Sequence, residues 1–199
     1  MKKSFLVIAI AVALMCLFAI TAFAATPDTT RETFTLKTGD DRIHFLNTGN
    51  SDAILLESNG MFALIDAGEG NSNPRRKTAY KGYEQEVINY LKSVTSVNGK
   101  VSLEFVLGTH AHYDHIGSFE AVISDEAVEI GTAYFKPFDA KITKDYEIES
   151  WKINETYDAV INALEAKNIP VVKDIPEQMV FGDFKLEFYN RVTPAELEG

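Results

Sequence analysis

Three of the four histidines in this chain lie within six consecutive positions, at His110, His112 and His115, and Asp114 precedes the last of them. The cluster follows the apolar run 103–107, which is typical of a buried strand, so it lies where a strand ends and a loop begins. Imidazole nitrogens and a carboxylate this close together are ligands for zinc and similar divalent ions. The pattern therefore predicts a metal site at the end of a core strand.

The spacing within the cluster favours two ions. In an extended chain, side chains two positions apart point the same way, so His110 and His112 can bind one ion from one side. Asp114 and His115 come after the chain begins to turn and are better placed for a second ion. A loop of surface histidines without metal is the simpler alternative.

The motif at residues 110–115 resembles the His-x-His-x-Asp-His signature of the metallo-β-lactamase superfamily. Upstream, residues 62–68 match the strand ending in Asp-x-Gly that precedes the signature in that superfamily. Residues 44–56 resemble the opening hairpin of the branch that holds ComEC-like domains and teichoic acid phosphorylcholine esterases. The likeness to the esterases rests on residues 52–60, Ile142-Thr143, Trp151, Tyr157-Asp158, Phe181-Gly182-Asp183 and Tyr189-Asn190.

This resemblance implies an α/β fold, a four-layer αββα sandwich with metals at one edge between two sheets. It implies a hydrolase in which metal-bound hydroxide attacks a carbonyl or phosphoryl centre, because the ion lowers the pKa of bound water to about 7. His110 and His112 would bind the first Zn²⁺, and Asp114 with His115 the second, with Mn²⁺ or Fe as alternatives; Asp114 would also act directly in catalysis. Asp66 would lie behind the site and orient the loop, the alternative being an ordinary turn residue.

The chain also departs from the superfamily pattern, which requires further histidines and an aspartate downstream. No histidine follows His115. We therefore expect residues 25–199 to be the amino-terminal portion of the domain, with a sandwich incomplete at its C-terminus. Such a chain is expected to be inactive alone, and residues 25–199 to be poorly soluble or partly molten. The alternative is a short natural protein that keeps a catalytically inactive, vestigial module.

The first 24 residues read as a signal peptide, with Lys2 and Lys3 before the apolar run 5–20 and small residues after it. The protein is therefore expected to be secreted or at the cell surface, touching the membrane only if the segment stays uncleaved.

The net charge of −10 argues against stable nucleic-acid binding, which depends on phosphate neutralisation by Lys and Arg. This weakens a ComEC-like nuclease role, a second alternative.

The substrate implied by the esterase likeness is a small-molecule or cell-envelope phosphoester. Tyr113 lies inside the metal loop and is expected to line the substrate cleft. Further aromatic residues are candidates for a choline-binding cage, with core packing as the simpler interpretation: Tyr134, Phe135, Phe138, Tyr146 and Trp151. His44 is interpreted as an ordinary strand residue, and the basic run 75–77 as a solvated loop.

The remaining pattern predicts alternating strands and helices. An Asn59-Gly60 hairpin turn separates two of the strands. Helices are predicted over 78–95 and 150–167 from their apolar stripes. Strands are predicted at 33–37, 42–47, 52–58, 61–66, 103–107, 170–173, 178–181 and 184–189.

Overall fold

The computed structural model describes residues 39–75, 81–136, 138, 143–189 and 191. Contacts divide the chain into Met1–Leu36 and Lys37–Gly199, and every described residue belongs to the second unit. The expected signal peptide and strand 33–37 therefore lie outside the described residues, as do Ile142 and Asn190. Within the described ranges, no helix is long and apolar enough to span a membrane.

Six strands form one sheet in the order β1-β2-β3-β4-β5-β6. The first three pair antiparallel and the rest parallel. Asn59 and Gly60 connect β2 to β3 with positive φ angles of 53° and 76°, as expected for the predicted hairpin turn. The strands are β1 (Arg42–Phe45), β2 (Ala53–Ser58), β3 (Met61–Ala67), β4 (Val101–Gly108), β5 (Val128–Phe135) and β6 (Val171–Val172). Strand β5 was not among those predicted.

Helices connect the parallel strands, because parallel neighbours require a crossover. They are α2 (Glu84–Thr95), α3 (Tyr113–Ile116), α4 (Phe119–Ser124), α5 (Asp145–Glu149) and α6 (Ile153–Ala166). Helix α2 starts later than predicted, since the backbone amides of Gly82 and Tyr83 donate to Asn71 Oδ1 and Glu69 O in a preceding loop. Helix α6 also starts later, because Lys152 adopts a left-handed conformation with φ 58°.

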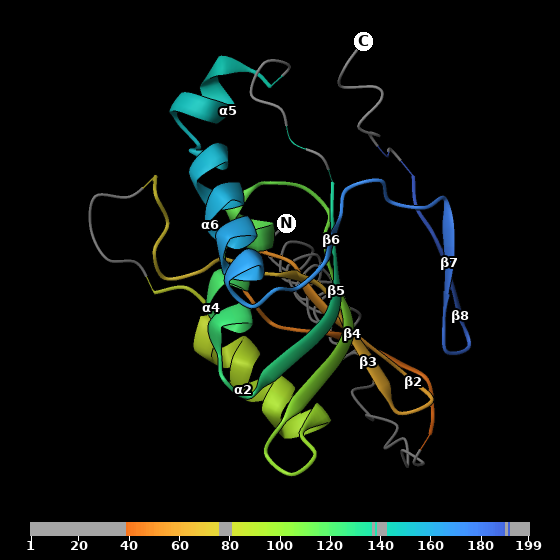
Figure 1. Cartoon of the computed structure of the whole chain (residues 1–199). Helices are drawn as coiled ribbons and strands as arrows, with labels where there is room; N and C mark the ends of the chain where they lie inside the picture. Colours follow the sequence, from red (N-terminus) through yellow and green to blue (C-terminus); the bar gives the residue numbers. More distant parts are fainter. Residues whose placement is uncertain (1–38, 76–80, 137, 139–142, 190, 192–199) are drawn as a thin grey trace, which may run out of the picture. The chain divides into compact units, whose positions relative to one another are not determined.

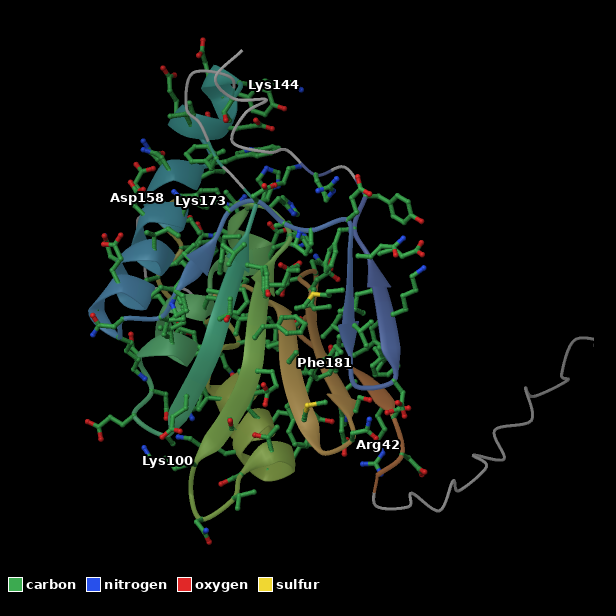
Figure 2. The ribbon with its side chains drawn as sticks, turned by 45° about the vertical axis from the view of Figure 1, so that its right-hand side comes forward. Arg42, Lys100, Lys144, Asp158, Lys173 and Phe181 are labelled. Carbon is green, nitrogen blue, oxygen red and sulfur yellow. The ribbon has the colours of Figure 1, made fainter. Side chains whose placement is uncertain are left out.

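The helices and a β-hairpin pack on opposite faces of the sheet (Figure 1). On one face, α2, α4 and α6 bury an apolar core that includes Leu64, Leu91 and Phe119. On the other, the hairpin β7 (Gln178–Phe181) and β8 (Phe184–Glu187) buries a smaller cluster around Phe105 and Phe181, and Figure 2 labels Phe181 in this region. The α/β class is as predicted, and the structure shows a central sheet in which β3, β4, β5 and β6 pair in parallel.

Candidate metal centre

Strands β3 and β4 run parallel and end at the same edge of the sheet, where each delivers part of the site. The histidine loop begins directly after Gly108, the last residue of β4. A side chain at Gly108 would clash with the core, since a Cβ there would lie 2.7 Å from Cδ1 of Phe135 and 3.1 Å from Cγ2 of Ile116. Gly117, at φ −62°, is likewise required by close packing against the backbone of Tyr113 and Gly70.

The three imidazoles of the loop gather around His110. Its ring centroid lies 3.9 Å from that of His115 and 4.6 Å from that of His112. His112 immediately precedes helix α3, whereas Asp114 and His115 lie within it, so the chain turns at the predicted point. Asp114 Oδ2 lies 4.0 Å from His115 Nε2. The structure therefore brings together all four residues that the sequence marked as metal ligands, and metal binding itself stays a prediction.

Asp66 lies behind this loop at the end of β3 and connects its parts. Its side chain is buried, 4% exposed, and its φ of 51° places it in the left-handed region. Oδ1 accepts the Thr109 amide at 2.9 Å, and Oδ2 accepts the Thr109 hydroxyl at 2.7 Å and His115 Nδ1–H at 2.8 Å. A left-handed conformation costs free energy for a non-glycine residue, so these three bonds hold it in place. A residue that serves only in a turn does not need three hydrogen bonds to its side chain.

The same contacts select the tautomers of two histidines. The single hydroxyl proton of Thr109 goes to Asp66, so the 3.0 Å contact between Thr109 Oγ1 and His110 Nδ1 requires Nδ1–H as donor. His115 donates its Nδ1–H to Asp66 directly. In the neutral ring, both histidines therefore carry the lone pair on Nε2, where a metal or a proton can bind.

The histidines differ in how readily they take a proton. Burial lowers the pKa of His110 to about 4, with the neighbouring imidazoles His115 and His112 adding to the effect. Burial also lowers the pKa of His112. For His115, burial acts in the same direction, but the hydrogen bond and charge of Asp66, with Asp114 and Asp52, outweigh it and raise the pKa. His110 and His112 are thus neutral near pH 7 with lone pairs available, whereas a metal at His115 competes with a proton.

These residues fit a metal ion in kind but not in number. Neutral imidazoles and a carboxylate are suitable ligands for zinc, which takes four donors in most protein sites. Across the described ranges, however, no group of three or more His, Cys, Asp or Glu side chains is arranged to hold one ion. The described part of the chain therefore supplies an incomplete set of ligands for one ion.

Two cavities meet at His112. One has a volume of about 200 Å³ and is lined by Arg75, His112, Tyr113, Asp114, Trp151 and Ile153. The other, of about 260 Å³, is lined by His110, Ala111, His112, Lys136, Phe138, Thr143, Glu147 and Ile153. Tyr113 therefore lines a cavity at the loop, and its role in a substrate cleft stays a prediction. Burial raises the pKa of its hydroxyl, so the phenol stays protonated.

The other aromatic candidates separate into two groups. Trp151 packs edge-on against His112, with ring centroids 4.9 Å apart, and Tyr146 packs against Trp151 at 5.1 Å. Phe138 lines the second cavity. Phe135 is instead buried at the end of β5 in the core between the sheet and the helices, and Tyr134 packs edge-on against Phe105 at 5.7 Å. Phe135 and Tyr134 thus pack in the apolar clusters on the two faces of the sheet, and core packing was the simpler interpretation of these aromatic residues.

Sequence reasoning missed two cations at the cavities. Arg75, assigned to a solvated loop, lines the first cavity; Arg76 and Lys77 lie outside the described residues. Lys136 lines the second, because it follows β5, whose last residue pairs in register with Gly108. Recognition of β5 as a strand parallel to β4 would have located Lys136. His44 lies in β1, hydrogen-bonded to Tyr90 and Glu57, as expected for a strand residue.

The chain was compared with known proteins. No family model and no curated protein matches it. Solved structures similar to it include two that are described as related to beta-lactamases. One is a Thermotoga maritima protein described as a candidate metallo-beta-lactamase, 20% identical with a TM-score of 0.39. Another is AbOPH, a hydrolase in the beta lactamase superfamily, 20% identical with a TM-score of 0.41.

The alignments are partial on both sides. They cover 71% and 64% of this chain, respectively. They cover 58% of the Thermotoga maritima protein and 45% of AbOPH, so the chain spans about half the length of each.

Proposed function

We propose that this chain carries part of the active site of an exported, metal-dependent hydrolase of the metallo-β-lactamase superfamily that acts on phosphoesters. The observation that supports it best is the role of Asp66. One buried carboxylate, through Thr109 and directly, directs the Nε2 lone pairs of His110 and His115 away from itself. A carboxylate that orients imidazoles from behind is the usual outer partner of histidine ligands to zinc.

The proposed division of ligands is the one that the family resemblance implies. His110 and His112 would hold the first ion, and Asp114 with His115 the second, with Zn²⁺ the expected metal and Mn²⁺ or Fe alternatives. A bound divalent ion would supply hydroxide near neutral pH and stabilise negative charge on the substrate. Asp66 and Thr109 bond the rings of His115 and His110, and the two cavities that His112 lines offer room for substrate.

A second candidate is a non-catalytic module that retains the ligand loop. It is favoured by the incomplete set of ligands among the described residues. The two candidates differ in turnover: the hydrolase, assembled with all of its ligands, cleaves a phosphodiester such as bis-p-nitrophenyl phosphate, whereas the module binds metal or substrate without cleavage.

Metal titration of the full chain tests the proposed centre. Isothermal titration calorimetry with Zn²⁺ and Mn²⁺ would compare the wild-type chain with His110→Gln, His112→Gln and His44→Gln. His44 lies in β1 and bonds Tyr90 and Glu57, so it is a matched control that removes one imidazole outside the loop. We expect the loop variants to lose binding and His44→Gln to retain it. Equal metal affinity in all four proteins would overturn the proposal.

A further inference from the structure

The cavity of about 200 Å³ beside His112 is lined by a cation and an indole that come from different segments of the chain. Arg75 comes from the loop after β3, and Trp151 from the corner between α5 and α6. A cavity of this size is far larger than the roughly 10–15 Å³ that one water molecule needs. It therefore has room for a small organic molecule.

Arg75 is held in position by its own loop. Its Nε donates to Asn73 Oδ1 at 3.3 Å, and its Nη2 lies 3.8 Å from Glu69 Oε1. Asn73 is buried and in turn donates its amide nitrogen to Glu69 at 2.8 Å. A guanidinium has five N–H donors in a planar fork, more than these two contacts take. The group is thus preorganised at the cavity with donors suited to an oxyanion.

Trp151 is held by ring contacts on two sides. It lies edge-on between His112 and Tyr146, with an interplanar angle of 88° to the first and 81° to the second. The left-handed Lys152 turns the chain directly after it, so that Trp151 stays outside helix α6 and borders the cavity. An indole in this position offers an apolar surface beside the cation.

We propose that Arg75 and Trp151 form a recognition site for an organic oxyanion, with the acidic group on Arg75 and an adjacent apolar, unsaturated group against Trp151. The inference deepens the proposed function, because it specifies the substrate class as an anionic ester with an apolar ester group. Asp114 lines the same cavity, and its negative charge repels an anion when no metal ion is bound beside it. Binding to the metal-free chain is therefore weak, and Asp114→Asn strengthens it.

Trp151 is the only tryptophan of the chain, so its fluorescence reports on this cavity alone. The full chain would be titrated, with a chelator present, with phenylphosphonate, inorganic phosphate and benzyl alcohol. Phenylphosphonate contains a carbon–phosphorus bond and is not an ester, so no hydrolysis complicates the titration. Phenylphosphonate is expected to bind most tightly, because only this probe carries both the acidic and the aromatic group.

Charge variants locate the acidic group. Arg75→Gln should weaken phenylphosphonate binding about tenfold, as expected for a charged hydrogen bond. Lys100→Gln removes one positive charge at the other end of β4, roughly 26 Å away at about 3.3 Å per residue, and should change nothing. Figure 2 shows Lys100 at the end of the sheet opposite Lys144. If Lys136→Gln weakens binding and Arg75→Gln does not, the anion binds in the second cavity and the proposal is wrong.

Calorimetry on Trp151→Leu tests the aromatic half. We expect a loss of about threefold to tenfold for phenylphosphonate and none for inorganic phosphate, since only the phenyl ring contacts the indole. Equal losses for both probes would overturn this half. Because a chelator is present, these results are independent of metal. Unchanged metal binding in His110→Gln and His112→Gln would reject the proposed centre, whereas failure of Arg75→Gln to weaken phenylphosphonate binding rejects only this site.

Discussion

The two faces of the six-stranded sheet are built from alternate residues of the same strands but are covered very differently. On the helix face, the side chains of Leu55, Leu64 and Leu91 are completely buried. On the hairpin face, Leu56 and Phe105 are buried under β7 and β8, but Ile43, directly opposite Leu56 in the register, is 50% exposed, and Phe45 is 78% exposed. One face therefore forms a closed core, and the other is only partly covered.

This difference indicates where the stability of the fold comes from. Burial of apolar surface contributes about 25 cal/mol per Å², so the face with the larger buried cluster dominates. The candidate site lies at the end of the strands, with Asp66 from β3 and the histidine loop from β4. We therefore expect substitutions to have the largest effect on the helix face, smaller effects on the hairpin face, and local effects at the site.

The strongest test of the closed face is Phe119→Ala. Phe119 is completely buried on α4 and packs edge-on against Phe135, with ring centroids 5.5 Å apart. Removal of the ring should lower the free energy of unfolding by about 3–5 kcal/mol, because the surrounding core only partly fills the cavity that the ring leaves. Urea denaturation followed by circular dichroism measures this. A loss below that of the next variant would contradict the comparison.

Phe181→Ala makes the corresponding change on the hairpin face. Phe181 is 4% exposed and packs edge-on against Phe105 at 5.4 Å. We expect a smaller loss, about 2–3 kcal/mol, because the two-stranded hairpin can collapse into the vacated space. Val180→Ala, in the same strand but 76% exposed, is the matched control and should have little effect.

Asp66→Asn tests the edge where the strands end. The change weakens bonds to Thr109 and His115, and should cost about 1–3 kcal/mol. It should also lower the pKa of His115, which NMR titration of its ring protons measures. The raised pKa of His115 stabilises the wild-type fold below the unfolded value of 6.5, and this contribution disappears as pH rises through the folded pKa. The part of the stability loss in Asp66→Asn that comes from His115 should therefore be largest in acid. An unchanged pKa would rule out this role.

The smallest effect is expected for Asp125→Asn, between α2 and α4. The hydrogen bond from Lys92, at 2.8 Å, lowers the pKa of Asp125. Its contribution is present above the unfolded value of 3.8 and is lost as pH falls through the folded pKa. Lys92 is 39% exposed, so solvent screening limits the effect to about 1 kcal/mol or less. Thermal melts of both proteins should differ more at pH 7 than at pH 3.

Local patterns in the sequence were enough to predict the elements that depend on neighbouring residues. The apolar stripe of α2, the Asn59-Gly60 turn and the position of the histidine loop after β4 all follow from residues close together in the chain. The periodicity of apolar side chains and the conformational freedom of glycine act over a few residues, so one sequence reveals them.

The family resemblance implied that Asp66 lies behind the loop, but only the tertiary structure decided which atoms of distant residues meet there. The hydrogen bonds of Asp66 to Thr109 and His115 cross more than forty positions of sequence, and they exist because β3 and β4 pair in parallel. Arg75 and Trp151 line one cavity although they come from the loop after β3 and the corner between α5 and α6. Strand order depends on how the whole chain buries its apolar surface, a property of all residues together, so no local pattern reveals these contacts.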